Sequence, residues 1–478
     1  MNVPSLEFVG FAAVIAIVIN VSNSSRWRTW IFALANLAFI ASFTHDWRQL
    51  LPFAGLLALG YGAMAAMVRW KSRPVFVALI IALVIAFCWL KRYAFLPAGS
   101  FLPFVYFTIG MSYVFFRVLH LVIDAYGESL PERIGPIEYV AYTLSFTSLV
   151  SGPIQLYGDY RRTALDSPAP LKRAALWAAF ERIVEGLFKV AILSPLLQSV
   201  QNSATDSIAA SGDAYHRILF FAAAVAIYPI YLFINFSGYT DFVIGIARFM
   251  RLDLPENFNE PFRSASFLDF WGRWHMTLSG WLKRYVYTSL AMNLIRRFPK
   301  PAVEPYIGVS AYFVTFFLVG IWHGQTTMFV IYGVLQGLGV SINKLYSILA
   351  MKRLGRARYR AIAARPAYVM LSRGLTFTYF AASLLWFWLD AAGLVHVYEI
   401  VGPLGVATGL AIVLAASSIA LTCFFGVGDR IRDGFRSGDW QLRLPHLRIA
   451  WTTALLVLAL SVTAVLNAPA PHVIYKAF

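Results

Sequence analysis

Long apolar stretches separated by short polar connectors run along almost the whole chain. A helix of about 20 apolar residues is long enough to cross the hydrocarbon core of a bilayer. The apolar stretches lie near residues 7–21, 29–43, 50–68, 75–90, 101–123, 174–199, 218–247, 308–340, 367–389, 402–425 and 449–467. The pattern therefore predicts an all-α polytopic membrane protein with about 11 transmembrane helices.

The region 248–300 interrupts this pattern, because it is dense in aromatic and charged residues. Pro255 and Pro261 break any continuous helix there. From Phe267 onward, apolar and aromatic residues recur at helical spacing, which favours an interfacial or re-entrant helix. Such a segment is tolerated at membrane depth only where protein buries it or where it lines a cavity.

Composition and charge agree with a membrane protein. Hydrophobic residues make up 59% of the chain and charged residues 13%, against roughly 25% charged residues in soluble domains. The net charge of +17 comes from Lys and Arg clustered in short connectors, such as 69–73 and 430–448. Such connectors stay cytoplasmic and are attracted to anionic lipid. We therefore expect membrane lipid and no nucleic acid as a partner, and both chain termini outside the cell.

We expect one integral membrane domain over residues 1–478. Its expected parts are N-terminal spans, a catalytic core, C-terminal spans and an extracellular tail, at 1–100, 101–345, 346–467 and 468–478 respectively.

His323 stands alone in an apolar run, from Gly308 to about Val340, that holds no Asp, Glu, Lys or Arg and no other His. An ionisable residue inside a membrane segment is costly and marks a functional site by default. The 36 residues of Gly308–Asn343 would form a helix of roughly 54 Å, against a hydrocarbon core of ~30 Å. We therefore expect a break at Gly320–Gly324, with two half-spans that hold His323 near the middle of the membrane.

A second histidine, His275, also follows a tryptophan and lies 48 positions before His323. Metal sites need three or four ligands, and the sequence shows no Cys or carboxylate at ligand spacing to either histidine, so we expect no metal. A Gly-x-Ser-x-Gly motif is also absent from the sequence. A single imidazole can instead act as the general base that lets a hydroxyl attack an acyl thioester. The thioester supplies the energy, so no bound cofactor is required. The alternative is that each histidine is simply buried in the core.

Several motifs resemble one known family. They are Asn235-Phe236-Ser237-Gly238-Tyr239-Thr240-Asp241, Leu254-Pro255-Glu256-Asn257-Phe258-Asn259, Phe270-Trp271-x-Arg273-Trp274-His275-x-x-Leu278-Ser279-x-Trp281 and Gly320-Ile321-Trp322-His323-Gly324. In order and spacing they resemble the membrane-bound O-acyltransferases, in particular the bacterial branch of alginate O-acetylation proteins and teichoic acid D-alanyl transferases. The resemblance is dense from about Ile109 to Asn343.

The resemblance implies a ring of tilted helices around a central funnel, where a cytoplasmic thioester and an extracellular hydroxyl meet at His323. His275 matches the second polar position of the family. The ending Val473-Ile474-Tyr475-Lys476-Ala477-Phe478 is similar to a family ending whose tyrosine is proposed as an acyl relay. The implied catalytic residues are His323, His275 and Tyr475, and the implied substrate-binding residues are Trp274, Trp322, Arg273, Asp241, Asn257 and Arg117.

Arg117, His120 and Asp124 share one face of a predicted span. They either line the funnel or form a buried ion pair between two helices.

The expected activity is transfer of an acyl group, acetyl first, from acetyl-CoA or an acyl carrier protein. The acceptor is an exported or cell-surface polysaccharide, and the expected location is the bacterial inner membrane. A periplasmic acyltransferase is an expected partner. D-alanyl transfer to a cell-envelope polymer is the enzymatic alternative. A transporter or flippase is the other alternative, although it predicts paired broken helices in two related halves, which the sequence does not show.

Overall fold

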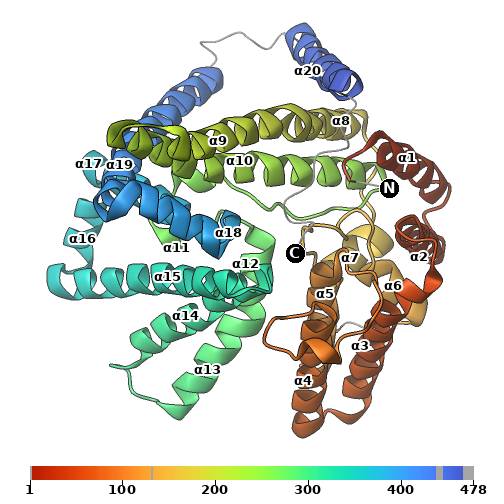
Figure 1. The fold of residues 1–478 in the computed structure, drawn as a ribbon. Helices are drawn as coiled ribbons and strands as arrows, with labels where there is room; N and C mark the ends of the chain where they lie inside the picture. Colours follow the sequence, from red (N-terminus) through yellow and green to blue (C-terminus); the bar gives the residue numbers. More distant parts are fainter. Residues whose placement is uncertain (1–2, 131–132, 438–444, 467–478) are drawn as a thin grey trace. The chain divides into compact units, whose positions relative to one another are not determined.

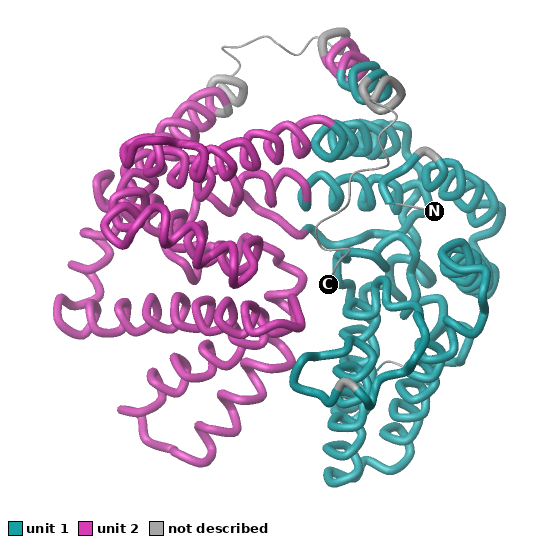
Figure 2. Tube along the Cα trace, viewed as in Figure 1, with its two compact units in different colours: residues 1–191, 236–256, 455–478 teal, residues 192–235, 257–454 magenta. Residues whose placement is uncertain are grey.

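The computed structural model describes residues 3–130, 133–437 and 445–466. Within these residues the regular elements are helices, which confirms the predicted all-α polytopic class (Figure 1). The chain divides into two compact units. Unit 1 comprises residues 1–191, 236–256 and 455–478, and unit 2 comprises residues 192–235 and 257–454 (Figure 2). The finer division expected from the sequence stays a prediction, as does the funnel.

Seven helical segments of the described chain are long and apolar enough to cross a membrane. They are Trp47–Trp70, Arg73–Leu90, Arg173–Ala210, Ala214–Phe249, Glu304–His323, Thr327–Leu354 and Ala391–Ile431. Two shorter apolar helices, Glu7–Ile19 and Arg448–Ser461, accompany them. Repeated crossing of the membrane is thus supported by helix length and composition, and the expected total of about 11 stays a prediction.

Unit 1 contains the N-terminal helices. These are α1 (Leu6–Ile19), α2 (Ser25–Ala41), α3 (Leu51–Trp70), α4 (Arg73–Leu90), α5 (Met111–Tyr126), α6 (Pro136–Thr143), α7 (Tyr157–Tyr160) and α8 (Arg173–Phe188). Helix α3 packs along α5 and α4, and α2 packs along α6 (Figure 1). The buried Arg28 donates from α2 to the carbonyl oxygens of Ala164 and Met250, so an otherwise costly buried cation is hydrogen-bonded.

Helix α10 (Ala214–Phe249) contributes its first part to unit 2 and its last part to unit 1. The other helices of unit 2 carry most of the candidate site. They are α9 (Ser194–Ala210), α11 (Phe267–Trp271), α12 (Met276–Leu282), α13 (Thr288–Arg297), α14 (Glu304–His323), α15 (Thr327–Leu354), α16 (Arg356–Ala363), α17 (Pro366–Ser383), α18 (Leu385–Trp388) and α19 (Ala391–Ser437). Helix α20 (Pro445–Leu466) crosses the boundary between the units.

The run Gly308–Asn343 forms a helical hairpin, and the expectation of two half-spans was wrong. The chain does break where predicted, because Gly324 is extended, with φ −168° and ψ 173°. Helix α14, of 20 residues, is about 30 Å long, so it can cross the hydrocarbon core by itself. Helix α15 returns antiparallel beside it (Figure 1). The excess length therefore forms a second helix that is itself long enough to cross a membrane, and His323 ends α14 at the tip of the hairpin.

Glycines allow the two helices of this hairpin to approach closely. A Cβ atom on Gly320 would lie 2.0 Å from the Cα atom of Gly333, far inside van der Waals contact. Farther along, Ser341 Oγ donates to the carbonyl oxygen of Val309 at 3.0 Å. Small residues at a helix crossing let backbones pack directly in a membrane, where the hydrophobic effect does not drive helices together. The position of His323 therefore depends on a backbone contact only three residues away.

Gly320→Ala should destabilise this hairpin, because the added methyl group meets backbone atoms that cannot rotate away. We expect a loss of about 1–3 kcal/mol in stability, measured as a lower midpoint of thermal unfolding for the purified protein. Gly308→Ala is the matched control on α14, because its Cβ atom would meet only Tyr287 Oη, at 3.3 Å. Equal unfolding midpoints for the two variants would contradict the close crossing.

Candidate active site

His323 is buried at the C-terminal end of α14, with 2% of its surface exposed. Its imidazole packs against three aromatic rings. The ring centroids lie 4.6 Å from Trp322, 5.3 Å from Phe387 and 5.9 Å from Tyr332. Residues from α14, α15 and α18 thus enclose one imidazole inside unit 2. This packing restricts the orientation of the ring, as a proton-transfer group requires.

His275 lies at the start of α12 in a backbone conformation that is unusual for a side chain of its size. Its φ of 44° and ψ of 51° place it in the left-handed region. Such a conformation costs on the order of 1–3 kcal/mol and persists where the surroundings impose it. The side chain is only 1% exposed. Strain at a buried histidine next to a helix start marks this position as a candidate site.

Asn257 holds the His275 segment from the side. Its backbone carbonyl oxygen accepts from Met276 N at 2.9 Å, and Asn259 N donates to Arg273 O at 3.0 Å. The side-chain Oδ1 of Asn257 lies 3.2 Å from His275 Nδ1. Two irregular segments, one after Pro255 and one before α12, are therefore joined by both backbone and side-chain hydrogen bonds.

Trp322 brings the two histidine motifs together. Its ring centroid lies 6.2 Å from that of His275 and 4.6 Å from that of His323. The two imidazoles are 48 positions apart in sequence and contact the same indole in unit 2. This arrangement is the strongest structural support for a single site that uses both histidines.

The other tryptophans of the His275 motif are packed into the protein. Trp274 is 1% exposed, and its ring centroid lies 5.1 Å from that of Phe380 and 5.2 Å from that of Phe258. Trp271 donates from Nε1 to Gln336 Oε1 at 3.2 Å. These contacts fix the backbone on either side of Arg273. For Trp274 they support a packing role, and its predicted contact with substrate stays a prediction.

Gln336 is a functional-site neighbour that the sequence reasoning did not identify. It is fully buried on α15, where it accepts from Trp271 and donates from Nε2 to Ser383 Oγ at 2.8 Å. This chain of hydrogen bonds links α11, α15 and α17. The sequence does contain a signal for Gln336, because an amide side chain in an apolar span is costly to bury unless it is hydrogen-bonded. Gln336 carries no ionisable group, so the cost of burying a charge does not single it out.

The predicted binding residues Arg117 and Asp241 belong to unit 1, whereas the two histidines belong to unit 2. Arg117 is buried and donates to the carbonyl oxygens of Thr143 and Ser148, each at 3.0 Å. These bonds show Arg117 satisfied by carbonyl oxygens. Whether it also binds substrate stays a prediction.

Asp241 uses both of its oxygens in ion pairs, 2.9 Å from Arg182 and 2.7 Å from Lys189. Arg273, in unit 2, pairs with Asp269 at 3.0 Å. These pairs support structural roles, and substrate binding by Asp241 and Arg273 stays a prediction. Tyr475 lies outside the described residues.

A cavity of about 440 Å³ lies beside the His275 segment in unit 2, between α11–α12 and α14. Met276, which follows His275, lines it together with Ser279, Lys283 and Thr315. The cavity combines aromatic walls with hydroxyl groups and one cation, as ligand sites often do. A substrate could reach the vicinity of α12 through such a space.

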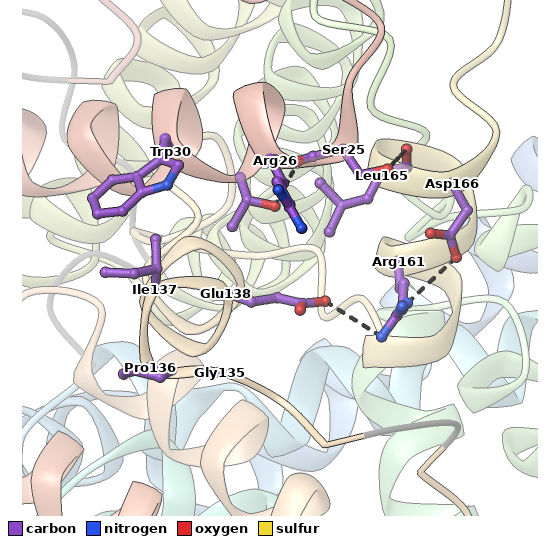
Figure 3. A pocket seen from close by; sticks show the side chains of 11 residues that line it. Ser25, Arg26, Trp30, Gly135, Pro136, Ile137, Glu138, Arg161, Leu165 and Asp166 are labelled. Atoms are coloured by element: carbon purple, nitrogen blue, oxygen red, sulfur yellow. Dashed lines mark hydrogen bonds and ion pairs between the residues drawn. The ribbon is translucent and has the colours of Figure 1, made fainter.

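A second cavity, of about 270 Å³, lies in unit 1 between α2, α6 and the turn Arg161–Asp166. Its charged side chains largely pair with one another, since Arg161 lies 3.9 Å from Glu138 and 3.4 Å from Asp166 (Figure 3). None of the predicted site residues lines it.

Among the described residues, no group of three or more His, Cys, Asp or Glu side chains could hold a metal ion.

A sequence model of the membrane-bound O-acyltransferase family matches residues 75–382, which include both histidines and their motifs. The chain belongs to this family. The predicted family is therefore confirmed, and the match extends beyond the Ile109–Asn343 core recognised from motifs. A family of acyltransferases does not support the transporter or flippase alternative, which is withdrawn.

The relatives similar to this chain are named as O-acetylating enzymes and a D-alanyltransferase. A probable alginate O-acetylase of Pseudomonas aeruginosa is 27% identical over 70% of this chain and 64% of its own length. A teichoic acid D-alanyltransferase of Bacillus subtilis is 27% identical over 65% of this chain and 79% of its own length. A peptidoglycan O-acetyltransferase of Helicobacter pylori is 38% identical over 25% of this chain and 21% of its own length. The chain thus spans less than two thirds of the alginate relative.

Proposed function

We propose that this membrane-bound O-acyltransferase transfers an acetyl group from a cytoplasmic thioester to hydroxyl groups of an exported or cell-surface polysaccharide. The observation that carries the proposal is the contact of two buried imidazoles with Trp322 in a chain of this family. The names of the alginate and peptidoglycan relatives support acetyl as the group and a glycan as the acceptor. The bacterial inner membrane is the location that fits a cytoplasmic donor and an exported acceptor.

His323 serves as the general base in this proposal. A ring nitrogen of His323 takes the proton of the acceptor hydroxyl while its oxygen attacks the thioester carbonyl carbon. The C–O bond forms, the C–S bond breaks, and the leaving thiolate recovers the proton. One ester and one thiol result from one thioester and one hydroxyl, so no oxidant or bound cofactor enters the balance. Coenzyme A and an acyl carrier protein both provide such a thiol.

D-alanyl transfer is the second candidate, because the teichoic acid D-alanyltransferase of Bacillus subtilis is as similar over a greater share of its own length. The same chemistry applies, since D-alanyl donors are also thioesters. Mass spectrometry of the purified envelope polymer decides between the two, because the acetyl and D-alanyl groups add different masses. A protein partner on the periplasmic side, which would receive the acyl group or pass it on, belongs to this proposal as well.

His323→Ala should abolish acyl transfer, because it removes the base and leaves an apolar methyl group in an apolar site. We expect a loss of about 10²–10⁴-fold in kcat, measured as ester formed on the polymer by membranes that contain equal amounts of protein. His396→Ala is the control, since His396 is exposed on α19 and is expected to have no effect. Near-normal acylation by His323→Ala would refute the assignment of the base.

His275→Asn should lose most activity while the protein remains folded. Asparagine tolerates the left-handed backbone that position 275 requires, so a loss measures the missing imidazole rather than added strain. We expect transfer to fall by about 100-fold with an unchanged unfolding midpoint. If transfer by this variant stayed at the wild-type level, the motif around His275 would be scaffold alone.

Tyr475→Phe should stop transfer without affecting stability, if the tail relays the acyl group as the sequence predicts. A neutral phenol is a weak nucleophile and needs a base such as His323, and the substitution removes only the hydroxyl oxygen. Tyr398→Phe, at an exposed position of α19, is the matched control. Ester formation equal to wild type would exclude the relay and leave the histidine assignments intact.

A further inference from the structure

Asn257 is a fully enclosed polar residue of the candidate site, with none of its surface exposed. Its Oδ1 atom receives three groups. Thr277 N lies at 3.3 Å, Thr277 Oγ1 at 2.7 Å and His275 Nδ1 at 3.2 Å. One amide oxygen therefore links the start of α12 to the side chain of the histidine that precedes it.

The orientation of this amide follows from chemistry. The backbone N–H of Thr277 can only donate, so the Asn257 atom that faces it must be the oxygen. A flipped amide would place its NH₂ group against that N–H, leaving two donors opposed. The native orientation leaves Nδ2 buried without a partner among the described residues, which is unfavourable. The contacts to Oδ1 therefore decide the orientation.

The orientation of the Asn257 amide also determines which ring nitrogen of His275 carries the hydrogen. A carbonyl oxygen only accepts hydrogen bonds, so His275 Nδ1 must carry the hydrogen that joins it to Asn257. In a neutral imidazole the other nitrogen, Nε2, is then an acceptor with no hydrogen. The left-handed backbone at His275 and the bond from Met276 N to Asn257 O hold the ring in this register.

We propose that Asn257 is a positioning residue that holds His275 with Nδ1 protonated and Nε2 bare. His275 then acts toward the substrates as a hydrogen-bond acceptor, for an O–H or N–H group, and does not donate to a developing oxyanion. This inference rests on the proposed function and replaces the substrate contact that the sequence predicted for Asn257. The amide acts through His275, much as a second group fixes the base in other catalytic sites.

The tautomer can be measured directly, without an activity assay. Protein with ¹⁵N-labelled histidine is purified in detergent or lipid, and His275→Gln identifies the His275 signals. The expected spectrum shows a protonated Nδ1 and an unprotonated Nε2 at neutral pH. The opposite tautomer, or a ring protonated at both nitrogens, would overturn the proposal. Because no turnover is needed, this result stands apart from the success or failure of the acyl-transfer proposal.

Substitutions at Asn257 test the consequence for catalysis. Asn257→Leu keeps the approximate size of the side chain and removes the acceptor. We expect kcat to fall by about 100-fold or more, with the KM of the donor changed by no more than about threefold. The ¹⁵N spectrum should gain the tautomer with Nε2 protonated. An unchanged kcat, or an unchanged tautomer in a folded variant, would refute the positioning role.

Asn257→Asp is the conservative variant, because a carboxylate still accepts from His275 Nδ1 and from Thr277. It should restore the protonated Nδ1 signal and regain activity relative to Asn257→Leu. No recovery of that signal would contradict the inference. Asn259→Leu is the matched control, since the exposed Asn259 lies two positions along the same segment. If Asn257→Leu fails to fold, the wild-type spectrum and Asn257→Asp still decide the question.

Discussion

The contact between the backbones of Gly320 and Gly333 is the constraint on which the candidate site depends. It lets α14 and α15 pack directly, with no side chain between them. His323 follows Gly320 by three residues and ends its helix, so the separation of the helices sets where the imidazole lies. Residues from both helices then surround the ring, together with Phe387 from α18. The tip of a hairpin can accommodate an imidazole in an apolar protein. The chain leaves the helix at this point whether or not a histidine is present.

The second part of the site is held by hydrogen bonds instead of helix packing. The irregular segments around Asn257 and His275 have backbone groups that no helix satisfies, and in an apolar setting such groups must find partners. Asn257 meets this need with both its backbone and its side chain. Gln336 likewise supplies a hydrogen-bond partner to Trp271, from α15, and donates to Ser383 on α17. Each buried amide thus links one motif of the site to a neighbouring segment by hydrogen bonds.

These two supports suit a transfer reaction that needs geometry more than reactive cofactors. In the proposed reaction the thioester carries the driving force, so the protein has to bring a hydroxyl, a carbonyl carbon and a base together. The family model covers both histidines and their motifs.

The sequence by itself determined the all-α membrane class and the place where the helix that carries His323 ends. These features are local, because apolar length and the cost of one imidazole can be read along a single stretch of chain. The family also followed from motifs whose order lies in the sequence. Local patterns could not show that the break at Gly324 reverses the chain into a second long helix packed along the first. That outcome depends on close backbone packing between Gly320 and Gly333, which lie 13 positions apart in the sequence.

Only the tertiary structure placed Trp322 beside both histidines, and only it showed Asn257 bound to His275 Nδ1. It also showed that Arg117 donates to a carbonyl oxygen and that Asp241 forms ion pairs. These contacts lie within unit 1, whereas the two histidines belong to unit 2. The physical reason is that hydrogen bonding and close packing act between residues distant in sequence. A sequence records which side chains are costly to bury, whereas the fold decides which partners offset that cost.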